Sequence, residues 1–354
     1  MFEWVVFIVI SVFLASLFTY HLYSTHQTTM KQEAEQLVHS ATASEFIIGK
    51  QLESISITLD KVRAALAPNW ERQTKSNPLL NNRLDLLGSA MPSVQAVTLL
   101  NKAGVVVASS KPQLIGESFA ERDYFSLVKT APHEQTLYVS PPFEGIFKDW
   151  LIAFSKAVLD SDGELAGVVI ILLNSQEYKQ SLNTLRPRID TWASLVHGDG
   201  VLFAWEPETL GILGRNLAQP GSLFSQHLHS GRSKSFYSDT TLIDNKPSMI
   251  AIHTVKPAKL NMDKPLIIGI ARNTASLYGK LQKDIFYIAA VFIFLNLFVG
   301  VGLYLSQRTR YKSSLSLAES EQVCLIELYF LIVFSRLLHK VCAIKRKQLC
   351  CLLI

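Results

Sequence analysis

The residues best suited to hold a small molecule lie close together in the first half of the chain. Arg122 is the first candidate, because a guanidinium stays charged and presents a planar fork of donors that matches a carboxylate. Tyr124, Tyr138 and Trp150 can form an aromatic wall that offers a hydroxyl or an indole N–H to a ligand. Asp123 can accept from a ligand amine or cap the start of a helix, and capping is the role we expect. The ordinary alternatives are a surface ion pair for the arginine and a place in the core for the aromatic side chains.

The rest of the chain offers little for catalysis or for a cofactor. It has no convincing carboxylate pair or nucleophilic serine motif, and the glycines at 211–214 are too closely spaced for a nucleotide loop. His227 and His229 stand two apart, and a metal site needs more ligands than that spacing provides. The net charge of +5 is spread along the chain and gives no reason to expect nucleic-acid binding. The sequence therefore predicts a binding protein without metal or cofactor rather than an enzyme.

Two apolar runs are long enough to cross a membrane. One extends from Trp4 to Tyr20 and the other from Ile285 to Leu305, and each approaches the roughly 20 residues that a spanning helix needs. We assign membrane helices to residues 1–23 and 285–305. The alternatives are a cleaved signal peptide for the first run and a buried core helix for the second.

Two spans place both chain ends on the same side of the membrane. Arg308, Arg310 and Lys312 directly follow the second span and favour a cytoplasmic C-terminus, although two lysines stand on its other flank. We therefore expect residues 24–284 to lie outside the cytoplasm.

Residues 24–67 have the pattern of one long helix. Apolar residues recur in steps of three and four from Met30 to Leu66, with one phase slip near Ser44, and Pro68 ends the pattern. Such a seam either pairs with a second copy of the chain or packs on the domain's own sheet. We expect the membrane-near half to pair in a homodimer and the far half to pack on the domain.

From Val94 the period of the apolar residues becomes that of strands. Residues 94–100 and 105–109 predict a β-hairpin with Gly104 in its turn. A helix is expected at 121–130, and the strands that follow are expected at 137–140, 151–159 and 164–173.

The same order of elements recurs further along the chain. Gly104 matches Gly200 and Gly116 matches Gly214, so the two copies are offset by 96 to 98 residues. The repeat predicts two similar modules in tandem, a membrane-distal one at 68–185 and a membrane-proximal one at 186–284.

This arrangement resembles a known family. A membrane span, a long helix, two tandem PAS-like modules and a second span are similar to the double Cache sensors of bacterial membrane receptors, most of all those of diguanylate cyclases. The resemblance covers about residues 24–284 and implies an α+β fold with antiparallel sheets, held in the bacterial inner membrane. The motifs that carry it are Gly116, Arg122–Phe125, Val139–Pro142, Trp150, Asp162–Gly163 and Gly167–Val168.

The chain departs from one subset of that family. In the amino-acid-binding members, an Arg is followed one residue later by Trp-Tyr, and an Asp lies on a late strand. Here Arg122 is followed by Asp123, Tyr124 and Phe125, and the late strand offers Leu172 or Asn174. The resemblance implies a small-molecule ligand, a carboxylate or an amine, and the departure weighs against an α-amino acid.

Residues 306–354 are too few for a cyclase, a kinase or a methyl-accepting domain. The composition changes abruptly at Val323, and all four cysteines of the chain lie beyond that point. The tail has three interpretations: a truncated or frame-shifted remnant of a longer receptor, which we favour, an amphipathic segment on the inner leaflet, or a docking segment.

Three functions remain open at this point. In the first, the chain is a membrane-anchored sensor that binds a small solute in its distal module and signals across the bilayer. It is, alternatively, the sensory half of a truncated diguanylate cyclase, or a membrane-tethered interaction protein without a ligand. We expect the first, with the lipid bilayer and a second copy of the chain as partners.

Overall fold

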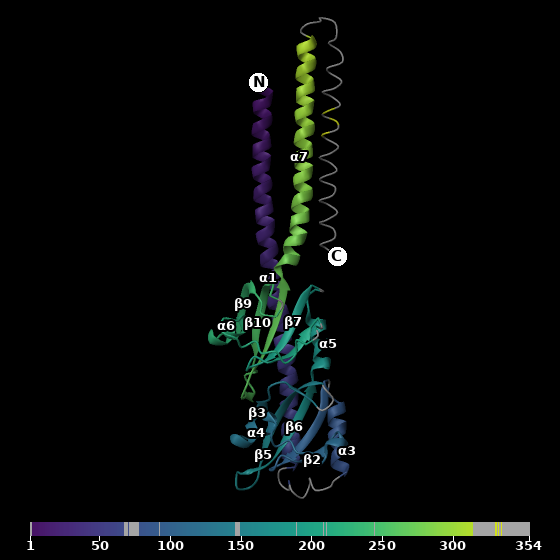
Figure 1. Cartoon of the computed structure of the whole chain (residues 1–354), viewed down its shortest axis with the longest axis vertical. Coiled ribbons are helices and arrows are strands. Elements are labelled where there is room, and N and C mark those ends of the chain that lie inside the picture. Colours follow the sequence, from purple (N-terminus) through teal and green to yellow (C-terminus); the bar gives the residue numbers. More distant parts are fainter. Residues whose placement is uncertain are drawn as a thin grey trace. The chain divides into compact units, whose positions relative to one another are not determined.

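The computed structural model describes residues 2–66, 70, 78–91, 93–145, 149–188, 190–207, 209, 211–243 and 245–313, with 330, 332 and 334. The chain divides into two compact units, one made of Gln27–Lys280 and the other of Met1–His26 with the chain from Leu281 onward. The predicted fold class is confirmed, because a long first helix, two antiparallel sheet modules and a long last helix follow one another (Figure 1). Most of the tail at 306–354 lies outside the described residues.

Two helices hold the apolar runs. Helix α1 (Phe2–Leu66) and helix α7 (Thr274–Ser313) each contain a segment that is long and apolar enough to cross a membrane, with mean hydropathies of 2.3 and 2.4. Neither apolar window is buried inside the protein, so the second run is not the core helix considered as an alternative.

The apolar parts of α1 and α7 contact each other through polar side chains. Asn296, which interrupts the second run, accepts from the Ser11 hydroxyl at 2.7 Å and donates to its own helix. The Trp4 indole donates to Gln307 at 2.8 Å. Hydrogen bonds between helices are one of the forces that hold membrane helices together, because lipid offers no competing partner.

The distal module is built on the larger sheet. Its strands follow the order β11-β3-β5-β6-β1-β2, with the short β4 paired to β5, and all pairs within the module are antiparallel. The elements are α3 (Pro78–Ser89), β1 (Val94–Asn101), β2 (Val106–Ser109), η2 (Pro112–Leu114), α4 (Asp123–Thr130), β3 (Thr136–Val139), β4 (Phe143–Glu144), β5 (Trp150–Leu159), β6 (Leu165–Asn174) and α5 (Ser175–Leu185).

The proximal module repeats this plan. Its sheet has the order β8-β7-β12-β10-β9, so in both modules a hairpin lies beside the last strand, which pairs on its other side with β5 in the distal module and with β10 in the proximal one. The elements are β7 (Thr191–His197), β8 (Leu202–Glu206), α6 (Leu223–His229), β9 (Lys234–Thr240), β10 (Pro247–Val255), β11 (Asn261–Met262) and β12 (Leu266–Asn273). Strand β11 leaves this module and pairs in parallel with β3 of the distal sheet.

The repeated glycines have the same backbone role in both modules. Gly104 and Gly200 turn the two hairpins at φ +81° and +91°, a region that side chains disfavour. Gly116 donates to Val106 and Gly214 donates to Leu202, in matching positions after each hairpin. The shared hydrogen bonds and sheet order support the duplication that the sequence predicts.

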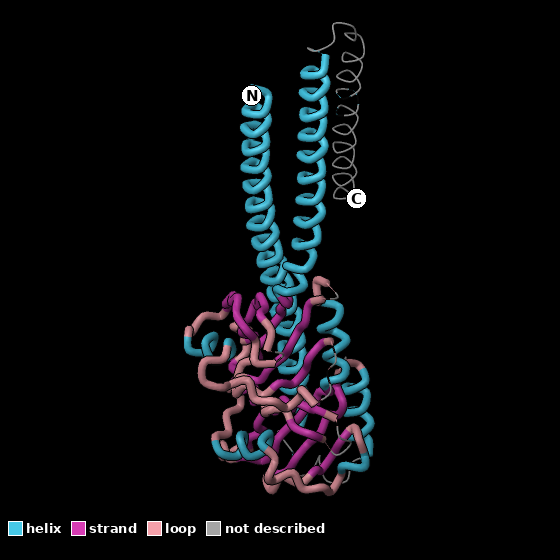
Figure 2. Tube along the Cα trace, turned by 45° about the horizontal axis from the view of Figure 1, so that its top comes forward, coloured by secondary structure: helices cyan, strands magenta, loops and turns pink. Residues whose placement is uncertain are grey.

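Helix α1 forms the spine of the larger unit, Gln27–Lys280. From Leu37 to Leu66 its buried side chains share one core with both sheets, for example with Phe154 of β5 and Ile268 of β12. Figure 2 shows the helices and the strands of this unit along the Cα trace. Helix α1 is continuous through Ser44, where the spacing of the apolar residues changes phase. The buried Ser44 hydroxyl donates to the Ser40 carbonyl. Packing on the protein's own sheets therefore extends into the membrane-near half, which we expected to pair between chains.

Three histidines are buried in the proximal module. His227 bonds Ser235 and Thr254 at 2.8 Å each, His253 bonds Glu45 of α1 at 2.9 Å, and His197 bonds the Val139 carbonyl at 3.1 Å. Burial lowers the pKa of all three, and it outweighs the opposing effect of Glu45 on the pKa of His253.

The buried histidines predict a loss of stability in mild acid. Because their pKa is lower in the folded chain than in the unfolded chain, the unfolded state binds more protons below about pH 6.5 and is favoured as the pH falls. We expect the free energy of unfolding to be constant above pH 7. Below pH 6.5 it should fall by up to about 1.4 kcal/mol per pH unit for each histidine. Urea unfolding of the full chain in detergent between pH 5.5 and 7.5 measures this slope.

The comparison removes one of the buried rings. His227→Gln should reduce the slope relative to that of the unaltered chain, because this ring is buried beside Ser235 and Thr254. A free energy of unfolding that does not change between pH 7 and 5.5 would contradict the prediction.

Candidate functional site

The distal module contains a cavity of about 170 Å³ between its sheet and the chain that leads into α4. Arg122 and Tyr124 line it, together with Lys111, Phe143, Leu151 and Leu172. The wall residues come from β1, β4, β5 and β6, from η2 and the residue before it, and from the start of α4 and the loop that leads into it. The cavity therefore lies where a movement of the α4 segment relative to the sheet would open or close it.

Arg122 is held at the start of α4. The predicted helix begins at Asp123 rather than at residue 121, and Arg122 occupies its N-cap position, where its carbonyl accepts from the amides of Phe125 and Ser126. The guanidinium stacks over the Phe143 ring at 5.4 Å. The backbone hydrogen bonds and the contact with the Phe143 ring therefore limit the conformations of the Arg122 side chain in the wall of the cavity.

Tyr124 forms part of an aromatic cluster beside Arg122. Its ring centre lies 5.3 Å from that of Phe143 and 6.2 Å from that of Phe119. Burial raises the pKa of Tyr124 far above its usual value, although Arg122 acts in the opposite direction. The hydroxyl is therefore neutral at physiological pH and able to donate a hydrogen bond.

The charge of the lining is positive. Lys111 and Arg122 both contribute to the wall, and none of the residues that the structure describes along it is acidic. The remaining polar members are Gln95 and Gln113, and Gln95 accepts from the Asn174 amide at 2.9 Å. Two cations above an apolar and aromatic floor favour an organic anion.

The other three predicted site residues lie elsewhere. Asp123 is exposed in the first turn of α4, so the capping role that we expected for it is wrong. The Tyr138 hydroxyl donates to the Ala131 carbonyl and accepts from the His133 amide, which fixes the loop between α4 and β3.

Trp150 has a different place from the one we expected. Its ring covers Gly214 of the proximal module, where an added Cβ would lie 1.9 Å from the ring. It connects the two modules and is not among the side chains that line the cavity.

Sequence reasoning missed Lys111, Phe143 and the glutamines. Lys111 follows β2, and Phe143 lies on a strand of only two residues, so neither belongs to a motif with a recognisable spacing. The Ser-Pro-Pro run just before Phe143 was the nearest available signal.

Comparison with known proteins confirms the fold of the unit Gln27–Lys280, which is called the sensor unit below. The extracellular domain of the histidine kinase rpHK1S-Z16 matches with a TM-score of 0.62 and 20% identity over 70% of this chain and 98% of that one. The ligand-binding domain of the Pseudomonas fluorescens chemoreceptor CtaA in complex with L-isoleucine matches with a TM-score of 0.51 and 16% identity, over 73% of this chain and 99% of that one. The ligand-binding domain of the Pseudomonas aeruginosa chemoreceptor PctB in complex with L-Arg matches with a TM-score of 0.50 and 14% identity, over 70% and 98%.

Sequence comparison gives no further assignment. No protein-family model matches the chain, and no curated protein matches its sequence. The chain thus has the fold of the extracytoplasmic sensory domains of bacterial receptors, as the resemblance to double Cache sensors implied.

Proposed function

We propose that this chain is a membrane-anchored receptor whose sensor unit lies outside the cytoplasm and binds a small carboxylate in the distal cavity. The observation that carries the proposal is the lining itself, in which Lys111 and Arg122 stand beside an aromatic cluster without an acidic neighbour among the described wall residues. A carboxylate would complete the hydrogen bonding of the guanidinium and neutralise part of this charge. The apolar walls would hold the carbon skeleton of the ligand.

The ligand that we propose has no amine. CtaA and PctB bind amino acids, and an ammonium group needs an acceptor of opposite charge when it is buried. In this chain Leu172 lies in the wall, and Asn174 bonds both Gln95 and the Gln176 amide at the start of α5. The described wall therefore recognises the carboxylate end of a ligand and offers an amine no charged partner.

Signalling would start from closure of the cavity. A ligand can shift the receptor only if it binds one conformation more tightly than the other. The cavity adjoins α4 and β6, and β6 and β5 pack through Ile171 and Phe154 into the same core as α1. The distal module is joined to the proximal one by the β3–β11 pairing and by Trp150 over Gly214, so both modules can follow the change.

The membrane position is part of the proposal. The two apolar helices flank the sensor unit in the sequence, and the matching solved domains are extracellular parts of receptors. A reporter enzyme that works only outside the cytoplasm should be active when it is inserted in the exposed turn at Asp162. The link to a diguanylate cyclase stays a prediction of the sequence resemblance.

Arg122→Gln is expected to weaken carboxylate binding about 10- to 100-fold. A hydrogen bond to a charged group is worth roughly 1.5–3 kcal/mol, and the amide of Gln cannot replace the charged fork. Calorimetry on the full chain in nanodiscs with benzoate and hexanoate measures the change. The corresponding amides, benzamide and hexanamide, should bind poorly to the unaltered chain.

The matched control is Arg83→Gln, which removes an exposed arginine of α3 in the same module. Its binding constants should equal those of the unaltered chain. Equal affinity in Arg122→Gln, or equal affinity for acid and amide, would remove Arg122 from the site. Absence of binding by any carboxylate would favour the ligand-free interaction protein.

A further inference from the structure

Strand β9 forms one edge of the proximal sheet, where it pairs with β10 in an unbroken register. The Thr254 amide donates to the Ser233 carbonyl just before the strand begins. Hydrogen-bonded pairs alternate along an antiparallel ladder, so every second residue of β9, beginning with Ser235, bonds β10. The residues between them turn their backbone N–H and C=O groups away from the sheet, and these are Lys234, Phe236 and Ser238.

The outward backbone groups have no partner within the part of the chain that the structure describes. Neither the backbone nor a side chain bonds them there, and Lys234, Phe236 and Ser238 are all exposed. The next outward donor, the Thr240 amide, is already bonded by the Asp239 carboxylate at 2.7 Å. A regular, unpaired edge of this kind can pair with a strand from another chain.

The edges formed by β8 and β2 are at least partly closed by the protein itself. The Leu202 amide of β8 donates to the Arg215 carbonyl, and the Leu202 carbonyl accepts from the amide of Gly214. Val106 of β2 is bonded in the same way by the segment that follows its hairpin. Among the described strands of more than two residues, β9 alone has an outer edge that no other segment of the chain bonds.

The internal duplication shows what fits such an edge. In the distal module β3 pairs with β5 as β9 pairs with β10, and β3 carries an extra strand, β11, on its outer side. The residue after β11, Asp263, accepts from the outward Val139 amide at 2.8 Å. None of the described residues of this chain occupies the corresponding place beside β9.

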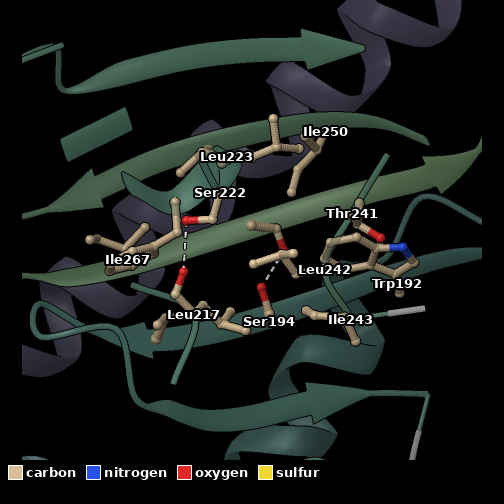
Figure 3. A pocket seen from close by; sticks show the side chains of 14 residues that line it. Trp192, Ser194, Leu217, Ser222, Leu223, Thr241, Leu242, Ile243, Ile250 and Ile267 are labelled. Carbon is tan, nitrogen blue, oxygen red and sulfur yellow. Dashed lines mark hydrogen bonds between the residues drawn. The ribbon is translucent and has the colours of Figure 1, made fainter. Parts of the chain in front are cut away.

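The edge is held in position from within its own module. The three residues after β9 line a small apolar cavity beside Trp192 (Figure 3). The first of them, Thr241, donates its amide to the Lys246 carbonyl at 3.2 Å and closes the hairpin with β10. Near the start of the strand, Ser235 bonds His227 of α6 at 2.8 Å. A strand that is already ordered loses little conformational entropy when a partner pairs with it.

The charge along the edge favours an acidic partner. Arg232 and Lys234 are both exposed at the start of β9, and Lys234 contacts Glu45 at 3.0 Å. Among the described residues, the Arg232 guanidinium forms no ion pair. Asp239, the acidic residue of the strand, accepts from the amide that follows it. The unpaired charge is therefore positive and would attract a carboxylate on the incoming segment.

We propose that the β9 edge binds an extended, acidic segment of a partner protein, which pairs with Lys234, Phe236 and Ser238 as β11 pairs with β3. This surface shares no residue with the carboxylate site and lies in the other module. It would place a partner on the module from which α7 continues.

The test uses two dye-labelled peptides, acetyl-TVTVTVDD-amide and acetyl-TVTVTVKK-amide, and measures their anisotropy with the full chain in nanodiscs of zwitterionic lipid. We expect the acidic peptide to bind about fivefold more tightly than the basic one. Ser238→Pro should weaken its binding at least about tenfold, because the ring removes an outward donor and obstructs the partner strand. The Ser238 amide does not bond β10, so the sheet is retained. Ser238→Ala is the matched control and should bind as the unaltered chain does.

The proposal fails if the acidic peptide does not bind, if both peptides bind equally, or if Ser238→Pro and Ser238→Ala have the same affinity. Should Ser238→Pro not fold, hydrogen exchange on the unaltered chain decides, because the peptide must slow exchange at Phe236 and Ser238. A dimer of the unaltered chain that Ser238→Pro dissociates would assign the edge to a second copy and overturn the proposal. Arg122→Gln must leave peptide binding unchanged, so that failure of the carboxylate site and failure of this edge are distinguishable.

Discussion

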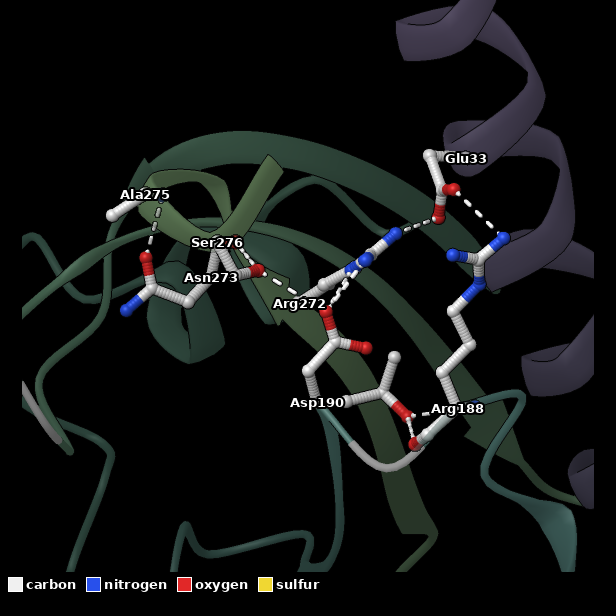
Figure 4. A network of polar contacts seen from close by, with 8 residues as sticks. Glu33, Arg188, Asp190, Arg272, Asn273, Ala275 and Ser276 are labelled. Carbon is white, nitrogen blue, oxygen red and sulfur yellow. Dashed lines mark hydrogen bonds and ion pairs between the residues drawn. The ribbon is translucent and has the colours of Figure 1, made fainter. Parts of the chain in front are cut away.

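Replacing Arg272 with Ala is expected to lower the free energy of unfolding by about 3–5 kcal/mol, because it leaves a buried carboxylate without its main partner. Arg272 lies on β12 and is 6% exposed. Its Nη1 is 2.6 Å from Glu33 of α1, and its Nε donates to Asp190 at 2.8 Å (Figure 4). Glu33 is itself only 8% exposed, so water cannot replace the lost cation.

The same carboxylate supplies a matched control. Arg188 also contacts Glu33, at 3.4 Å, but its side chain is 48% exposed. Arg188→Ala should therefore cost less than about 1 kcal/mol, as is usual for pairs in water. Urea unfolding of the full chain at pH 7.5 measures both variants. Equal losses in the two would show that burial of the Arg272 pair carries no special weight.

This ion pair connects the first helix of the chain to the strand that leads into the last helix. Strand β12 ends at Asn273 and α7 begins at Thr274, so Arg272 stands just before the last helix while Glu33 belongs to the first. The pair fixes the position of α1 relative to the start of α7 within the sensor unit. In Glu33→Gln the charged guanidinium faces a neutral amide in place of a carboxylate, so this variant should weaken the contact with a smaller loss of stability than Arg272→Ala.

The fold was predictable wherever local pattern and global packing agree. The hairpin of β1 and β2 consists of two short, mostly buried apolar runs, and Gly104 marks the turn that joins them. The duplication was visible because Gly104 and Gly200 need the same backbone conformation and therefore persist at a constant offset. The apolar seam of α1 predicted a buried face, since helical spacing alone decides which side chains point together.

The site was predictable only in part, because a cavity is made by residues far apart in the sequence. Arg122 and Tyr124 were found, since both belong to one short helix start that faces the sheet. Lys111 could not be found, because only the folded hairpin brings it to the same wall. Trp150 was misplaced for a similar reason: the glycine that accommodates its ring lies in the other module.

The partner of the α1 seam was also beyond the sequence. The heptad-like spacing is the same whether the buried face meets a second copy or the protein's own sheet. Both sheets turn out to present apolar faces to it, including Leu99 of β1 and Leu195 of β7. The spacing of the apolar residues in α1 thus predicts which side chains are buried but does not identify the residues that they pack against.

Leu59→Ala is expected to destabilise the sensor unit by about 3–4 kcal/mol, an effect as large as that of Arg272→Ala. Leu59 is fully buried in the core that α1 shares with the two sheets. Its removal loses the transfer free energy of the side chain and leaves a cavity that rigid strands cannot close, and Leu→Ala changes of this kind cost about 2.7–5 kcal/mol. Urea unfolding of the full chain in detergent measures the loss.

Ile57→Ala provides the comparison on the same helix, because Ile57 is 54% exposed. If the chain is a monomer, Ile57→Ala should lower the free energy of unfolding by less than about 0.5 kcal/mol, because this side chain buries little apolar area on folding. Similar costs for the two variants would mean that α1 does not rest on the sheets through Leu59. A large loss in Ile57→Ala that grows with protein concentration would instead show that a second copy covers this outer face, as expected for a homodimer.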